Sequence, residues 1–122
     1  MGLLNKINVV SGSSGALTST GDYSLGVTLP AGAKVVHIYF DETTNCATSA
    51  SGTVQVQAAG PVSGDVALTA AIAAGSVATG EVAVTNGFAI VESSPLQVTV
   101  ATGALTAGAI TVYVAYINGN DA

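Results

Sequence analysis

The chain has 122 residues, of which 49% are hydrophobic and only 7% are charged, and its formal net charge is −5. Two lysines and no arginine cannot neutralise a row of phosphates, which excludes nucleic-acid binding and anchoring on an anionic membrane. Because an ordinary soluble domain carries about 25% charged residues, this surface must consist largely of small and neutral polar side chains.

The length suits one domain that buries roughly two thirds of its unfolded surface. No apolar run approaches the roughly 20 residues of a membrane-spanning helix. Residues 1–6 lack the pattern of a secretory signal, so we expect a protein made in the cytoplasm of its host. Cys46 is the single cysteine, which rules out an intrachain disulfide.

Residues 1–21 are expected to form an N-terminal arm or an edge strand. Ile7 and Val9 alternate with polar residues, and a stretch rich in Ser, Gly and Thr follows, which is typical of a loop or flexible arm. If residues 1–21 lie outside the core, deletion of residues 2–15 should leave the fold intact.

Residues 22–122 are expected to form a single domain of alternating strands. Residues 22–29 and 33–40 are the first two, each with apolar side chains at every second position. Pro30-Ala31-Gly32 between them fits a type I turn with glycine in the left-handed position, so we predict that the two strands form an antiparallel hairpin.

The polar stretch of residues 41–51 reads as a surface loop. Its acids, Asp41 and Glu42, lie among hydroxyl side chains, but the order of an EF-hand is absent and no metal site is predicted. Cys46 in this stretch has no nearby lysine or arginine to lower its pKa, so we expect an unreactive thiol.

Two further strands are expected at residues 52–59 and 96–100, where Val, Leu and Ala alternate with Gln and Thr. Residues 65–78 allow two interpretations. Ala and Leu favour a short helix, whereas the β character of the neighbouring segments favours a strand or irregular chain, and we adopt the second.

Asn86-Gly87 is the strongest two-residue turn signal in the chain. Short apolar pieces flank it at residues 81–85 and 88–91. The pattern predicts a β-hairpin built from these two pieces.

The last strand, within residues 105–117, is apolar on both faces, and residues 29–40 repeat its formula of an Ala-Gly-Ala turn before a β-branched run. One face of each strand suits the core. The other face has no evident covering from its own chain, so we expect another subunit to cover it. The interface candidates on this face are His37, Tyr39, Tyr113 and Ile117.

No catalytic or cofactor-binding residue is predicted. The chain has one histidine, no arginine and no G-x-S-x-G motif, and its glycine-rich stretches lack the lysine of a P-loop. A sugar-binding platform is disfavoured because there is no Trp, although Tyr39 and Tyr113 share a face and are candidates for stacking on each other.

Three stretches carry a resemblance to a known family. They are V-T-L-P-A-G-A-K-V-V-H-I-Y-F at residues 27–40, the Thr-rich residues 41–52, and L-T-A-G-A-I-T-V-Y-V-A-Y-I at residues 105–117. Taken together, the chain resembles small all-β virion proteins of tailed bacteriophages.

The resemblance implies a non-enzymatic capsid decoration, or cement, protein that binds the major capsid protein on the outside of the phage head, often as a homotrimer. Two alternatives stay open: a tail or head-fibre component, and a carbohydrate- or surface-binding module. A neutral exterior rich in Thr, Ala and Gly agrees with the structural role because it costs little to desolvate against a neighbour. Residues 1–21 and 41–51 are the expected contact elements.

The strand count, about seven to nine with regular turn signals, predicts an all-β fold. We expect an antiparallel β-sandwich, jelly-roll-like in its connections, with no cofactor and no metal ion.

Overall fold

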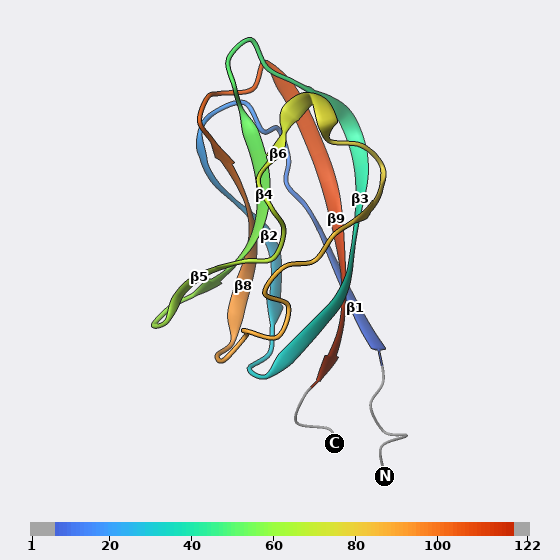
Figure 1. Ribbon diagram of the computed structural model, residues 1–122, viewed down its shortest axis with the longest axis vertical. Helices are drawn as coiled ribbons and strands as arrows, with labels where there is room; N and C mark the ends of the chain where they lie inside the picture. Colours follow the sequence, from blue (N-terminus) through green and yellow to red (C-terminus); the bar gives the residue numbers. More distant parts are fainter. Residues whose placement is uncertain (1–6, 119–122) are drawn as a thin grey trace.

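The computed structural model describes residues 7–118. Nearly all of its regular structure is β, and strands follow one another with short connections (Figure 1). The elements in chain order are β1 (Ile7–Ser13), β2 (Gly21–Leu29), β3 (Ala33–Ala47), β4 (Thr53–Gly60), β5 (Gly64–Ala67), β6 (Ile72–Ala73), a 3-10 turn (Ala74–Ser76), β7 (Gly80–Val82), β8 (Ser94–Ala101) and β9 (Ala107–Asn118).

The strands form two antiparallel sheets packed face to face, which confirms the predicted β-sandwich. One sheet has the order β1-β9-β3-β7, and the other has the order β2-β8-β4-β5 with β6 added beside β4. The first strand therefore pairs with the last, the second with the next to last, and the third with β7. This is the jelly-roll arrangement, in which one long antiparallel ribbon is rolled into two sheets.

Alternating side chains fill the space between the sheets. Phe40 is 1% exposed and Val114 is fully buried, whereas Tyr39 and Tyr113 on the opposite faces of the same strands are exposed. Every buried side-chain polar atom among the described residues has a hydrogen-bonding partner. The largest fully buried side chains are Phe40, Leu17, Leu29, Ile38, Leu68, Leu96, Ile110, Val54, Val56, Val98, Val100 and Val112.

The N-terminal stretch contains a strand of the first sheet. Residues 7–13 pair with β9 along their whole length as β1, so the loop that was expected from Ser11 begins after Ser13. Gly12 allows β1 to lie directly on β2, since a Cβ there would collide with the carbonyl oxygen of Leu25. Deletion of residues 2–15 would therefore remove a paired strand, contrary to our expectation. Residues 1–6 lie outside the described residues.

The turn at residues 30–32 forms, but it does not make a hairpin. The amide of Ala33 donates to the carbonyl of Pro30 at 3.1 Å, and Gly32 has φ +80°, which belongs to a type II turn instead of type I. β2 pairs with β8 while β3 pairs with β9 and β7, so the turn carries the chain from one sheet to the other. The expected β2–β3 hairpin is wrong, because the two strands belong to different sheets of the sandwich.

β3 is longer than predicted and contains a bulge. It runs to Ala47, so most of the expected loop at residues 41–51 is strand. Its pairing with β9 shifts between Val35 and His37, which turns Val35 into the core, where it is only 3% exposed. Strict alternation from His37 and Tyr39 predicts Val35 on the outer face, and the extra residue in the bulge reverses that assignment.

Asn86 and Gly87 turn the chain without forming a hairpin. Asn86 has φ +50°, as the sequence predicts, but β7 pairs with β3, and the pieces flanking the turn do not pair with each other. The carbonyl of Gly87 instead accepts a hydrogen bond of 2.8 Å from the Val35 amide at the β3 bulge. Residues 65–78 contain β5, β6 and the 3-10 turn, which confirms the choice of strand and irregular chain for that region.

Candidate interaction surface

The two sheets of the sandwich present chemically different outer faces. On the β2-β8-β4-β5 sheet the outward side chains are polar and bond to one another. The Gln97 side-chain amide donates to Gln57 at 2.9 Å, Gln57 donates to Gln55 at 2.9 Å, and the Thr99 hydroxyl donates to Asp22 at 2.7 Å. This face is already hydrogen-bonded within the chain and is suited to contact with water.

The outer face of the β1-β9-β3-β7 sheet exposes several large apolar side chains among polar ones. Ile7 and Val9 of β1 are 60% and 61% exposed, and no charged residue occurs in β1 or β9. Exposed aliphatic and aromatic side chains gathered on one sheet face are typical of a contact surface. We call this surface the apolar outer face, after its apolar members Ile7, Val9, Tyr39, Tyr113, Ala115 and Ile117. The register also places the polar side chains of Ser11, Lys34, His37, Asp41, Glu81 and Thr111 on it.

Strand register brings the four predicted interface residues onto this one face. Tyr39 lies directly opposite Tyr113 because β3 and β9 are neighbours, and His37 lies opposite Ala115. Ile117 lies opposite Ile7 at the end of the same sheet. The two strands with the repeated formula are therefore adjacent, which the sequence alone did not decide.

The two tyrosines contact each other through their rings. Their centroids are 6.2 Å apart with an interplanar angle of 68°, an edge-to-face arrangement. Tyr39 is 45% exposed and Tyr113 is 38% exposed, so much of each ring remains open to a partner. The stacking suggested by the sequence is present within one chain, and it leaves a broad aromatic surface.

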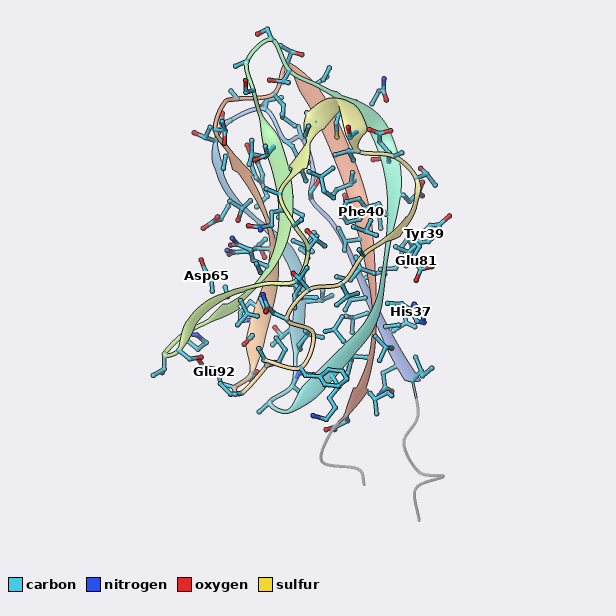
Figure 2. The ribbon with its side chains drawn as sticks, in the orientation of Figure 1. His37, Tyr39, Phe40, Asp65, Glu81 and Glu92 are labelled. Atoms are coloured by element: carbon cyan, nitrogen blue, oxygen red, sulfur yellow. The ribbon has the colours of Figure 1, made fainter. Side chains whose placement is uncertain are left out.

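A hydrogen-bonded His–Glu pair lies beside the tyrosines. Nδ1 of His37 is 2.6 Å from Oε2 of Glu81, and the two side chains are 63% and 64% exposed. Figure 2 shows His37, Tyr39 and Glu81 projecting from the same side of the molecule, away from the core residue Phe40. Glu81 was not predicted for this surface, because nothing in the sequence indicates that β7 pairs with β3.

A shallow hollow of about 410 Å³ lies at the edge of the tyrosine pair. It is lined by Tyr39, Asp41, Thr79 and Tyr113. Asp41 shares the outer face of β3 with Tyr39, two residues earlier, because the strand continues where a loop was expected. The hollow is wide and open, so it is suited to receive one side chain of a partner and not to enclose a small molecule.

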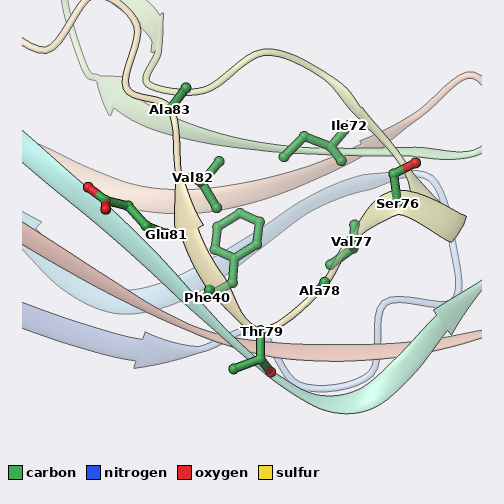
Figure 3. Close-up of a pocket in the computed structure, with 10 residues that line it drawn as sticks. Phe40, Ile72, Ser76, Val77, Ala78, Thr79, Glu81, Val82 and Ala83 are labelled. Carbon is green, nitrogen blue, oxygen red and sulfur yellow. The ribbon is translucent and has the colours of Figure 1, made fainter.

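A second hollow, of about 280 Å³, lies between residues 72–83 and the ring of Phe40 (Figure 3). Ile72, Val77 and Val82 form much of its wall. Glu81 is the only ionisable residue that lines it, and the hollow therefore lacks the convergent polar groups of a catalytic or ligand site.

The residues considered for a metal site are spread along β3. Successive side chains of a strand point to opposite faces, so Asp41 and Glu42 diverge, and Glu42 accepts a hydrogen bond of 2.8 Å from the Cys46 amide. Among residues 7–118, no group of three His, Cys, Asp or Glu side chains is placed to hold an ion.

Cys46 is a core residue at the end of β3 and not a loop thiol. It is 5% exposed, and its Sγ is close enough to Gly108 that a Cβ there would lie 2.9 Å away. Burial, reinforced by the negative charge of Glu42 and a hydrogen bond to it, raises the pKa of Cys46 to about 11. The thiol is therefore held in its protonated, unreactive form.

Comparisons with known proteins identify the fold. A chain of the cyanophage Pam1 capsid asymmetric unit superposes with a TM-score of 0.59 at 22% identity, over 96% of this chain and 88% of that one. A chain of the acidic stable capsid of Helicobacter pylori bacteriophage KHP30 superposes with a TM-score of 0.58 at 14% identity, over 94% of both chains. At these identities the likeness shows a shared fold.

No family model matches the sequence, and no curated protein matches it. In the described part of the chain, no helix has the length and hydropathy that crossing a membrane requires.

Proposed function

We propose that this chain is a structural, non-enzymatic protein of a bacteriophage virion: a capsid decoration, or cement, protein on the outside of the head. The observation that carries the proposal is the likeness of nearly the whole chain to chains in two phage capsid structures. Its partner is the major capsid protein, and it is made in the host cytoplasm before it joins the particle.

The contrast between the two outer faces supports a role in assembly. The polar face satisfies its own hydrogen bonds, whereas the apolar outer face exposes Ile7, Val9, Tyr39 and Tyr113 to solvent. Covering such side chains contributes about 25 cal/mol for each Å² of apolar surface removed from water. Many copies of one modest contact then hold a shell together, because avidity multiplies the individual affinities.

The interface candidates on this face are His37, Tyr39, Tyr113 and Ile117. We assign them to contacts between copies in a homo-oligomer, with a trimer favoured, and to contacts with the capsid lattice. Residues 1–21 are the second proposed contact element. They include β1, an edge strand of the sandwich, whose Ile7 and Val9 join this element to the apolar outer face.

Binding to phage heads tests the proposal directly. Purified protein is added to heads that lack it, and bound copies are counted after sedimentation and located by electron microscopy. We expect saturable binding at regular positions on the outside of the lattice. Binding confined to tails or fibres would assign the chain to another part of the virion, and absence of binding to any particle would refute a virion role.

A further inference from the structure

The geometry points to an arginine side chain, supplied by a protein other than this chain, as the occupant of the hollow formed by Tyr39, Asp41, Thr79 and Tyr113. This assignment rests on the proposed function, in which the apolar outer face meets a capsid protein. At one point of that face, the capsid protein must then present a guanidinium group.

The hollow combines an aromatic surface with a carboxylate. The Tyr39 and Tyr113 rings meet edge to face, so a guanidinium group can lie against a ring while it donates hydrogen bonds to Asp41. Among residues 7–118, no hydrogen bond or ion pair engages the Asp41 carboxylate, whereas Glu81 is paired with His37 and Glu42 accepts from Cys46. Asp41 is thus the acid on this face that is available to an incoming cation.

Arginine fits this combination better than lysine does. Its planar guanidinium stacks on aromatic rings and carries several donors in a fork that matches a carboxylate. An ammonium group is a compact, strongly hydrated charge that gains less from an open, partly wet hollow.

This chain is poorly equipped to supply the cation from a second copy. Each copy carries seven acidic side chains against two lysines, so a further copy brings mainly charge of the sign already present. Nζ of Lys34 already lies 4.9 Å from the centroid of the Phe88 ring. Within one copy, Lys34 cannot fill the hollow either, because it is seven residues before Asp41 along β3, about 23 Å away at the rise of a β-strand.

The face therefore divides by charge. The part formed by β1 and β9 carries no charged residue and suits contact between copies. The part formed by β3 and β7 carries the charges: Lys34 lies at one end of β3, over the Phe88 ring, and Asp41 lies beside the tyrosines, where it suits a basic group of a partner. Electrostatic complementarity of this kind selects a partner and its orientation more than it adds affinity.

Titration with a small arginine probe tests the assignment. The tyrosine ring resonances of the full chain are followed by NMR as N-acetyl-arginine methylamide is added, with the neutral citrulline analogue as the matched probe. We expect saturable shifts at Tyr39 and Tyr113 with the arginine probe only. Asp41→Asn should weaken its binding by roughly threefold, the scale of one exposed ion pair.

Asp65→Asn is the control variant, because Asp65 is an exposed carboxylate on β5 of the other sheet, and it should bind the probe as the wild type does. Equal shifts with citrulline, no shift at either ring, or equal binding by Asp41→Asn would each overturn the assignment. Shifts at these rings with methyl glucoside but not with the arginine probe would also overturn it and identify a sugar platform.

Head binding by Asp41→Arg separates this inference from the proposed function. We expect at least a tenfold loss of occupancy, because the variant places a positive charge against the partner's arginine. Wild-type occupancy by Asp41→Arg would refute the arginine and leave the decoration role standing. A positive arginine titration from a protein that binds no head would support the hollow and refute the decoration role.

Discussion

At the scale of single residues, Cys46 shows how the fold sets the chemistry of a side chain. The sequence places it in a polar stretch, but the extension of β3 buries it against Gly108. Desolvation of the thiolate raises its pKa from about 9 to about 11, and the nearby Glu42 carboxylate adds to the shift. The folded chain therefore keeps the Cys46 thiol protonated up to a higher pH than the unfolded chain does.

This pKa difference predicts a loss of stability at high pH. In the unfolded chain the thiol gives up its proton near pH 9, while the folded chain keeps it until about pH 11. Because the folded state then binds more protons, the free energy of unfolding contributed by Cys46 is fully present below pH 9 and falls as the pH rises toward 11.

Urea unfolding of the wild type and of Cys46→Ala at pH 8 and pH 10.5 measures the effect. Other groups titrate equally in both proteins, so the wild type should lose more stability than Cys46→Ala between the two pH values. Equal losses would show that the thiol does not remain protonated in the folded chain.

The side chain of Glu92 stabilises the turn between β4 and β5. Its carboxylate accepts hydrogen bonds from the Ser63 hydroxyl, from the Ser63 amide at 2.6 Å and from the Val62 amide at 3.1 Å. These bonds, led by the one from the Ser63 hydroxyl, lower the pKa of Glu92. Glu92 therefore ties the β4–β5 turn to the segment that precedes β8.

At the scale of elements, β1 completes the first sheet. It is an edge strand in the described part of the chain, and its seven residues all pair with β9. Val10 packs against the core, and Gly12 lies on the backbone of Leu25 in β2. An edge strand of this kind contributes both to the fold and to the apolar outer face.

Two deletions separate the strand from the residues before it. The variant without residues 2–6 is the reference, and removing residues 2–13 should lower the free energy of unfolding below that of the reference by roughly 3 kcal/mol, the scale of losing a large side chain from a core. Urea unfolding at neutral pH provides the measurement. Equal stability of the two deletions would show that the sandwich does not need β1.

At the scale of the whole molecule, the sandwich has one face suited to water and one suited to partners. The sequence has few charges with which to prevent association. On the β2-β8-β4-β5 sheet, hydrogen-bonded glutamines and threonines take the place of charges and keep that face hydrated. Among residues 7–118, the side-chain hydrogen bonding on the apolar outer face is limited to the His37–Glu81 pair, and the β1 and β9 portion is uncharged. Association between copies is therefore expected through that portion.

A lysine on the β1 or β2 edge strand of each sheet, pointing outward, tests this expectation. Val9→Lys should shift the sedimentation coefficient from that of an oligomer to that of a monomer, because an unpaired charge would have to be buried between copies. Ser24→Lys, on the exposed side of β2 in the other sheet, is the matched control and should sediment as the wild type does. Dissociation by Ser24→Lys alone would place the contact on the polar face.

The sequence by itself determined which side chains face in and out along most strands, because alternation with a period of two is a local property of the chain. It placed Tyr39, His37, Tyr113 and Ile117 on outward faces correctly, and it predicted the sandwich. Val35 was the exception, since a bulge shifts the alternation by one residue and leaves no clear signal in the composition.

Only the tertiary structure decided which strands are neighbours. The jelly roll pairs the first strand with the last, so Tyr39 meets Tyr113 from far along the chain and Glu81 meets His37 through β7. The chain turns at residues 30–32 and 86–87, where the sequence predicts turns, yet neither turn connects two strands of a hairpin. A turn sets only the local direction of the chain, whereas the partner of each strand is chosen by the burial of both sheets together.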